Sequence, residues 1–147
     1  MFSRIGVKTE WDGYYRRCLG RYDKPIVIQM TAGTAESNRP SALAYTRPLQ
    51  GRIQVFYDRV QRAAALSRLP DVLAHVLVHE ITHVIEGTNQ HPDFGIMKTH
   101  WNSEDYHQMM SSPLSFTEEH LQFIHNGLAA RSRSTSETGE DLKRLRR

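Results

Sequence analysis

The chain has 147 residues, of which 39% are apolar and 24% charged, a balance that fits one ordinary globular domain and excludes wholesale disorder. Residues 131–147 hold six of the 19 Lys and Arg residues and three of the 16 acids, so they account for the whole net charge of +3. Residues 1–130 are therefore neutral, and we expect no nucleic-acid partner for the folded part.

Targeting and redox signals are few. No apolar run approaches the roughly 18 residues that a membrane helix needs, and residues 1–11 (MFSRIGVKTEW) lack the apolar core of a signal peptide. We therefore expect no membrane partner and, by default, a cytoplasmic location. The single cysteine, Cys18, cannot form an internal disulfide, so no oxidising compartment is implied.

The first half of the chain has the patterns of a small sheet. Residues 8–19 predict a short helix, and the β-branched run 25–30 (PIVIQM) predicts a buried strand. Small turn-forming residues make 31–40 a loop, and a second strand is expected over 41–46. The stretch Arg52–Asp58 (RIQVFYD) alternates apolar and polar residues at period two, which predicts a half-buried strand.

The second half is helical. From Pro70 to Gly87 apolar residues recur at steps of three and four, which predicts a helix of about four to five turns ended by the glycine. The elements expected after it are an irregular stretch over 88–101, a short helix from Asn102 or Ser103 to Met110, a helix from the capping box Ser115–Glu118 to Leu128, and a disordered tail over 131–147. We expect an α+β fold in a single domain over 1–130, with three to five strands.

The predicted helix carries the motif His79-Glu80-Ile81-Thr82-His83, which is HExxH. Residues four apart on a helix share a face with their Cβ atoms about 5–6 Å apart, so two imidazoles there can bind one ion. Glu80 is rotated off that face but can reach a metal-bound water as a general base. The sequence therefore predicts a zinc site with one Zn²⁺ per chain.

A catalytic zinc site needs a third protein ligand and one position for water. Gly87 lets the chain turn sharply at the helix end, and His91 can then fold back to the ion. Met97 follows six residues later.

These residues resemble the metzincin zinc metalloproteases, whose HExxHxxGxxH motif precedes a methionine in a tight turn. The resemblance implies His79, His83 and His91 as metal ligands, Glu80 as base and Met97 as the turn methionine. It also implies that Arg52–Asp58 is the edge strand that pairs with an extended substrate. The offsets from the second histidine depart from the family: the glycine comes after four residues rather than three, and the third histidine after eight rather than six.

Other ligand sets stay open at this point. A third ligand from His100 would need a different loop path, and a carboxylate from a following helix would indicate a gluzincin. The carboxylates in question are Glu104, Glu118 and Glu119. His75 lies one turn before His79, too far from His83 for one ion to bind both, so we expect it to pack against the ligands. The remaining helical histidines lie on polar or mixed faces and are expected at the surface or at its boundary with the core: His107, His120 and His125.

We therefore expect a zinc metalloendopeptidase with a minimal metzincin-like fold, which hydrolyses extended peptides with a zinc-bound water activated by Glu80. Two alternatives are a metal-dependent endoribonuclease and a non-catalytic zinc-binding module. The neutral body disfavours the first, and a purely structural zinc site has no need of Glu80.

Overall fold

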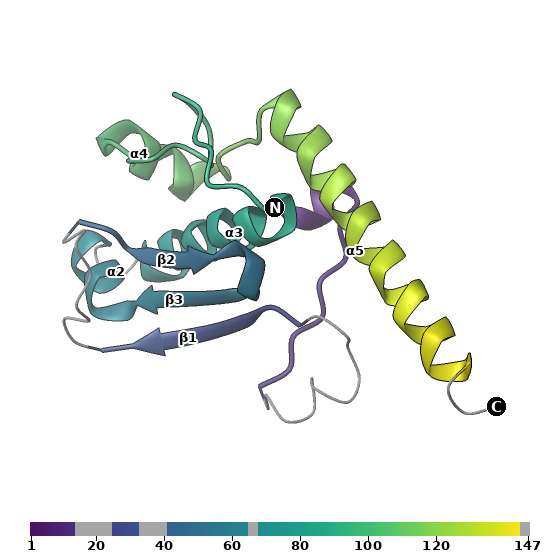
Figure 1. Ribbon diagram of the computed structural model, residues 1–147. Helices are drawn as coiled ribbons and strands as arrows, with labels where there is room; N and C mark the ends of the chain where they lie inside the picture. Colours follow the sequence, from purple (N-terminus) through teal and green to yellow (C-terminus); the bar gives the residue numbers. More distant parts are fainter. Residues whose placement is uncertain (14–24, 33–40, 65–67, 145–147) are drawn as a thin grey trace.

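The computed structural model describes residues 1–13, 25–32, 41–64 and 68–144, with side chains up to residue 133. Its elements in chain order are η1 (Phe2–Ile5), β1 (Val27–Thr31), β2 (Ala44–Arg47), η2 (Pro48–Gln50), β3 (Arg52–Phe56), α2 (Tyr57–Ala63), α3 (Leu69–Glu86), α4 (Ser103–Ser111) and α5 (Glu118–Arg144). The expected α+β class is confirmed: within the described ranges, a mixed sheet of three strands accompanies four α-helices (Figure 1).

The strands lie in the order β1-β3-β2. β1 is parallel to β3, with Ile28 beside Ile53, and β2 is antiparallel to β3, with Thr46 on the other side of Ile53. The expectation that Arg52–Asp58 is an edge strand is therefore wrong. Alternation in a sequence tells which face of a strand is buried, but the number of neighbouring strands depends on pairing with distant segments.

The third strand is also shorter than the alternation suggests. It ends at Phe56, and Tyr57 and Asp58 begin α2, a helix that the sequence analysis did not predict. Asp58 forms an ion pair with Arg62 at 3.0 Å, four residues later, and this spacing is a helix signal that alternation over seven residues obscured.

One face of the sheet packs on α3, which lies behind it in Figure 1. Ile53 and Val55 of β3 and Val72 and Val76 of α3 belong to the same core, and each is at most 2% exposed. Burying a side chain of this size contributes about 1.5–3 kcal/mol. The sheet and the helix are therefore held together by this apolar layer, and α3 is fixed along most of its length.

The last helix crosses the C-terminal end of α3. Ile124 is fully buried, and at Gly127 a Cβ atom would lie 2.0 Å from the carbonyl oxygen of Ile85, so only glycine permits this approach. The helix starts at Glu118, with the Thr117 hydroxyl accepting a hydrogen bond from the backbone N–H of His120 at 3.2 Å. The first turn of α5 is thereby brought beside the end of α3.

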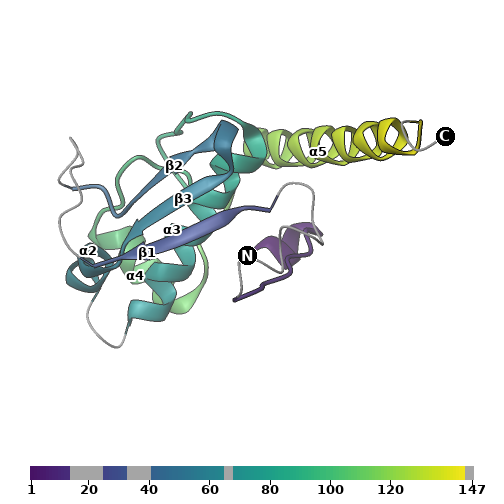
Figure 2. The same cartoon turned by 60° about the horizontal axis from the view of Figure 1, so that its bottom comes forward.

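α5 continues far beyond the residues that pack against α3. It projects from the body of the protein (Figure 2) and includes residues 131–144, where we expected a disordered tail. Arg, Glu, Leu and Lys in this stretch are good helix formers, so low apolar content does not by itself exclude a helix.

Two other expectations concern the N-terminal part. Residues 8–13 are irregular, so the described half of the predicted helix over 8–19 is not helical. The rest of it, with Cys18, and most of the loop over 31–40 lie outside the described residues. No helix in the segments that the structure covers has the length and apolarity needed to span a bilayer.

Candidate metal centre

Three histidine side chains meet at the C-terminal end of α3. His79 and His83 lie four residues apart on one face of the helix, and both are buried. The helix ends at Gly87, whose backbone is left-handed (φ 69°) and whose N–H donates to the His83 carbonyl at 2.9 Å. The chain then reverses and brings back His91, so that the ligand atoms of the three histidines all lie within 4.8 Å of one another.

The three rings present the same atom to a common centre. The Nε2 atoms are 3.0 Å apart for His79 and His83, 3.1 Å for His83 and His91, and 3.3 Å for His79 and His91. The Nδ1 atom of His79 lies 2.9 Å from the Ile96 carbonyl, and that of His83 lies 2.9 Å from the Thr88 carbonyl. Because a carbonyl only accepts hydrogen bonds, both Nδ1 atoms carry the proton and both Nε2 atoms expose a lone pair.

The pKa values of His79 and His83 agree with this assignment of the protons to Nδ1. Burial, together with the neighbouring imidazoles, lowers the pKa of His79 to about 4 and that of His83 to about 3. At neutral pH both rings are therefore uncharged. The short Nε2–Nε2 contact between them is then a meeting of two lone pairs, which a hydrogen bond cannot stabilise and a cation can.

The spacing fits a metal ion. Histidine nitrogens about 2.0–2.1 Å from a tetrahedral ion lie roughly 3.3 Å from one another, close to the three distances in this cluster. Within the described ranges the cluster has three ligand residues. The donor set could therefore hold one metal ion and leave a fourth coordination position for another ligand.

The structure leaves the rival ligands outside the cluster. Among the residues described, the one such group consists of His79, His83 and His91, and the alternatives are all exposed at the surface: His100, Glu104, Glu118 and Glu119. His75 is buried but engaged elsewhere, because its Nδ1 lies 2.7 Å from the Asp71 carbonyl and its Nε2 accepts the N–H of Leu114 at 3.1 Å. It therefore lies one turn before His79 and outside the cluster, as expected.

Glu80 lies next to the first histidine and is 9% exposed. The hydroxyl of Thr46, on β2, donates a hydrogen bond to its carboxylate oxygen Oε2. Burial raises the pKa of the Glu80 carboxyl to about 7, and the hydrogen bond from Thr46 opposes that shift. A carboxyl with a pKa near neutrality can both take up and release a proton, which is the property that a general base needs. Sequence analysis missed Thr46, because it lies 34 residues from Glu80.

Met97 lies in a tight turn. The N–H of Lys98 donates to the carbonyl of Gly95 at 3.4 Å, and Met97 is 1% exposed. Gly95 has φ 80°, and a Cβ atom there would lie 2.5 Å from the Ser115 carbonyl oxygen, so a side chain does not fit. The resemblance described above implies a turn at this methionine, and the structure has a turn there.

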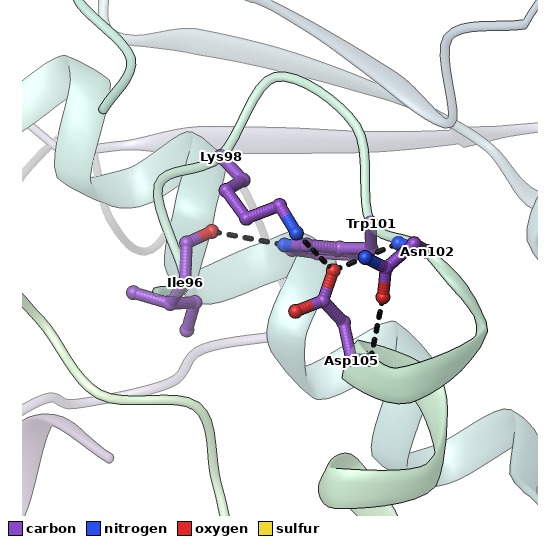
Figure 3. Close-up of polar contacts among 5 residues, drawn as sticks. All are labelled: Ile96, Lys98, Trp101, Asn102 and Asp105. Atoms are coloured by element: carbon purple, nitrogen blue, oxygen red, sulfur yellow. Dashed lines mark hydrogen bonds and ion pairs between the residues drawn. The ribbon is translucent and has the colours of Figure 1, made fainter. Parts of the chain in front are cut away.

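The turn is tied to the ligands through a single backbone carbonyl, that of Ile96. It accepts the proton of His79 Nδ1. It also accepts, at 3.3 Å, a hydrogen bond from the Trp101 indole Nε1 (Figure 3). The Trp101 ring meets the His79 ring edge to face, with centroids 5.8 Å apart. Trp101 therefore holds in place the carbonyl that orients His79. Its ring also restricts rotation of the His79 imidazole.

The segment that carries Trp101 is anchored in turn by Asp105. Its carboxylate accepts hydrogen bonds from the Lys98 ammonium group and from the backbone N–H of Asn102, while the Asn102 side chain accepts the N–H of Asp105 at 3.0 Å (Figure 3). This capping box starts α4 and holds both ends of the segment 98–102.

Replacement of Trp101 by phenylalanine tests this support. The variant keeps an aromatic ring but loses the indole N–H, so we expect zinc affinity to fall about 10- to 100-fold, the usual cost of an outer hydrogen-bond partner of a ligand. Competition with a chromophoric chelator measures the affinity. Trp11→Phe is the matched control, since Trp11 is 66% exposed. Equal affinities in the two variants would contradict the role of Trp101.

His120 corrects another expectation. The sequence predicts a surface or boundary position for it, but it is 3% exposed, and the described residues give neither ring nitrogen a hydrogen-bond partner. Its positive charge is the smallest of the causes that lower the pKa values of His79 and His83, after burial of those two rings. A sequence signal existed: His120 precedes the buried Ile124 by four residues and so shares its helical stripe.

Comparison of the chain with protein-family models, with characterised proteins and with solved structures gives no match.

Proposed function

We propose that the protein is a zinc-dependent peptidase in which His79, His83 and His91 hold the ion and Glu80 is the general base. The observation that carries the proposal is the pair of converging Nε2 lone pairs beside a buried carboxyl with a pKa of about 7. Imidazole ligands suit several divalent metals, and zinc with three histidines and an open position is the usual hydrolytic form.

Zinc bound by the three histidines would supply Lewis acidity, which polarises a carbonyl and lowers the pKa of water in the open position. Glu80 takes a proton from the attacking water and delivers it to the departing amine. Thr46 keeps the Glu80 carboxylate in place, because its hydroxyl donates to Oε2. The carbonyls of Ile96 and Thr88 hold the imidazoles of His79 and His83 in the orientation that ligation needs.

An extended substrate has a natural place beside the site. β2 pairs with β3 on one side, and its other edge has no strand partner among the described residues. Free backbone groups on such an edge bind an extended peptide by adding a strand. Since Thr46 of β2 contacts Glu80, a peptide on this edge would pass the general base. We therefore place the substrate on β2, not on β3.

This function fits the observations better than the two alternatives. A structural zinc site takes four protein ligands, whereas the cluster has three in the part of the chain described. A nuclease needs positive charge for the phosphate backbone, but residues 1–130 are neutral. The turn at Met97 further supports the resemblance to metzincins, with the longer spacing to His91 taken up by the irregular residues after Gly87.

The test is cleavage of a mixed peptide library by the purified protein. We expect one zinc per chain, hydrolysis that a chelator abolishes, and recovery when about one equivalent of Zn²⁺ is returned. Mass spectrometry of the products and metal analysis provide the two measurements. Zinc bound at one equivalent without cleavage of any library peptide would refute the peptidase and leave the metal site standing.

A further inference from the structure

The outward face of the sheet, beside the edge strand β2, is open and positively charged. Thr46 points inward to Glu80, so its neighbours Tyr45 and Arg47 project to the other face, where both are exposed. A cavity of about 180 Å³ lies on this face, with Tyr45, Arg47 and Arg52 among its lining residues. A strand added to the free edge of β2 would place every second side chain beside this cavity.

Two arginines that line this cavity lie directly opposite each other on neighbouring strands. Arg47 of β2 pairs in register with Arg52 of β3, and both are exposed. Like charges at opposed positions of neighbouring strands destabilise a sheet. No ion pair joins either guanidinium to a carboxylate among the residues described. The pair therefore carries positive charge that an acidic ligand would compensate.

We propose that this face is a substrate subsite for an acidic side chain, with Arg47 as its main determinant. The inference rests on the proposed peptidase function. A peptide on the free edge of β2 lies one strand spacing, about 4.8 Å, from β2 and two spacings from β3. An outward Asp or Glu of that peptide is thus a direct cross-strand neighbour of Arg47, while Arg52 acts on it from one strand farther away.

The subsite lies close to the bond that is cut. Arg47 immediately follows Thr46, whose hydroxyl contacts the Glu80 carboxylate. The peptide residue beside Arg47 is therefore within about two residues of the bond that faces Glu80, and the next residue along the peptide points to the opposite face. The preference for an acid is expected at one position near the scissile bond and not at its immediate neighbours.

The experiment compares kcat/KM for peptide sets that carry Glu, Gln or Lys at each position around one cleavage site. We expect Glu to exceed Gln by about two- to five-fold at a single position, the range that a cross-strand charge pair supplies, and Lys to be the poorest. Added salt should reduce the preference. In Arg47→Glu the order reverses to favour Lys, and Arg52→Glu shifts it in the same direction by less.

Arg4→Glu is the matched control, because it makes the same charge change at an exposed residue of η1, away from the sheet. It should keep the wild-type order. Zinc content of each variant reports on the integrity of the site. Cleavage with no acidic preference, or with a preference that Arg47→Glu leaves unchanged, overturns the subsite and spares the peptidase. Zinc-loaded protein that cleaves none of the peptides overturns both.

Discussion

Replacement of Glu80 by glutamine is expected to lower kcat by about 10²- to 10⁴-fold, the contribution of a general base, while zinc stays bound. The amide has nearly the size of the carboxyl and can still accept the hydrogen bond from Thr46, but it cannot take a proton. Because Glu80 is not one of the clustered ligands, the zinc content of the variant should equal that of the wild type. Single-turnover hydrolysis and metal analysis on the same sample separate the two effects.

Glu86→Gln is the matched control for this change. Glu86 lies on the same helix, and burial together with the nearby Glu119 also raises the pKa of its carboxyl to about 7. Its two carboxylate oxygens have no hydrogen-bond partner among the described residues, so its removal breaks no contact seen there. We expect wild-type rates from this variant. If Glu80→Gln hydrolyses peptides as fast as Glu86→Gln, the proposed base is the wrong residue.

Removal of His91 is expected to lower both the affinity for zinc and the peptidase activity. His91→Ala leaves two ligands, His79 and His83, on α3, and a catalytic zinc site needs three. We expect affinity to fall by more than the about 10- to 100-fold that loss of an outer-shell partner costs. The gain in thermal stability that zinc gives the wild type should shrink with it, since a ligand that binds the folded state at free concentration c stabilises it by RT ln(1 + c/Kd), which falls as Kd rises. A chelator competition and thermal melts with and without zinc measure both.

His100→Ala and Glu104→Gln are the controls, because both residues are exposed alternatives that the sequence leaves open as ligands. Each should retain wild-type zinc affinity. Loss of zinc from Glu104→Gln, with His91→Ala unaffected, would move the third ligand to α4 and change the proposed class from a metzincin-like to a gluzincin-like peptidase.

The parts of the site that sequence predicts are those set by local spacing. His79 and His83 share a face because four residues make about one helical turn, and Gly87 can be placed at the helix end because glycine adopts the left-handed conformation readily. The return of His91 follows from a short connection after that glycine. These statements need only the stretch from Pro70 to Met97, which is why the cluster could be foreseen.

The features that could not be predicted from the sequence depend on contacts between distant segments. Thr46 reaches Glu80 across 34 residues, and the position of β3 between two strands follows from its pairing with both β1 and β2. No pattern within Arg52–Asp58 contains that information. The role of Trp101 is intermediate: its contact with the Ile96 carbonyl spans five residues, but it matters only because His79 shares that carbonyl.

The Ile96 carbonyl, which accepts hydrogen bonds from both His79 and Trp101, also affects how a bound ion could leave the site. An ion that leaves the cluster must first be released by His91 or by a ring on α3, and His79 cannot swing away while Ile96 holds its Nδ1 proton. Ile96 is itself held by the N–H bond to Ser115 and by Trp101. A rotation that frees a bound ion from His79 would therefore require local opening of the chain around Met97, so we expect the exposed His91 to release the ion first.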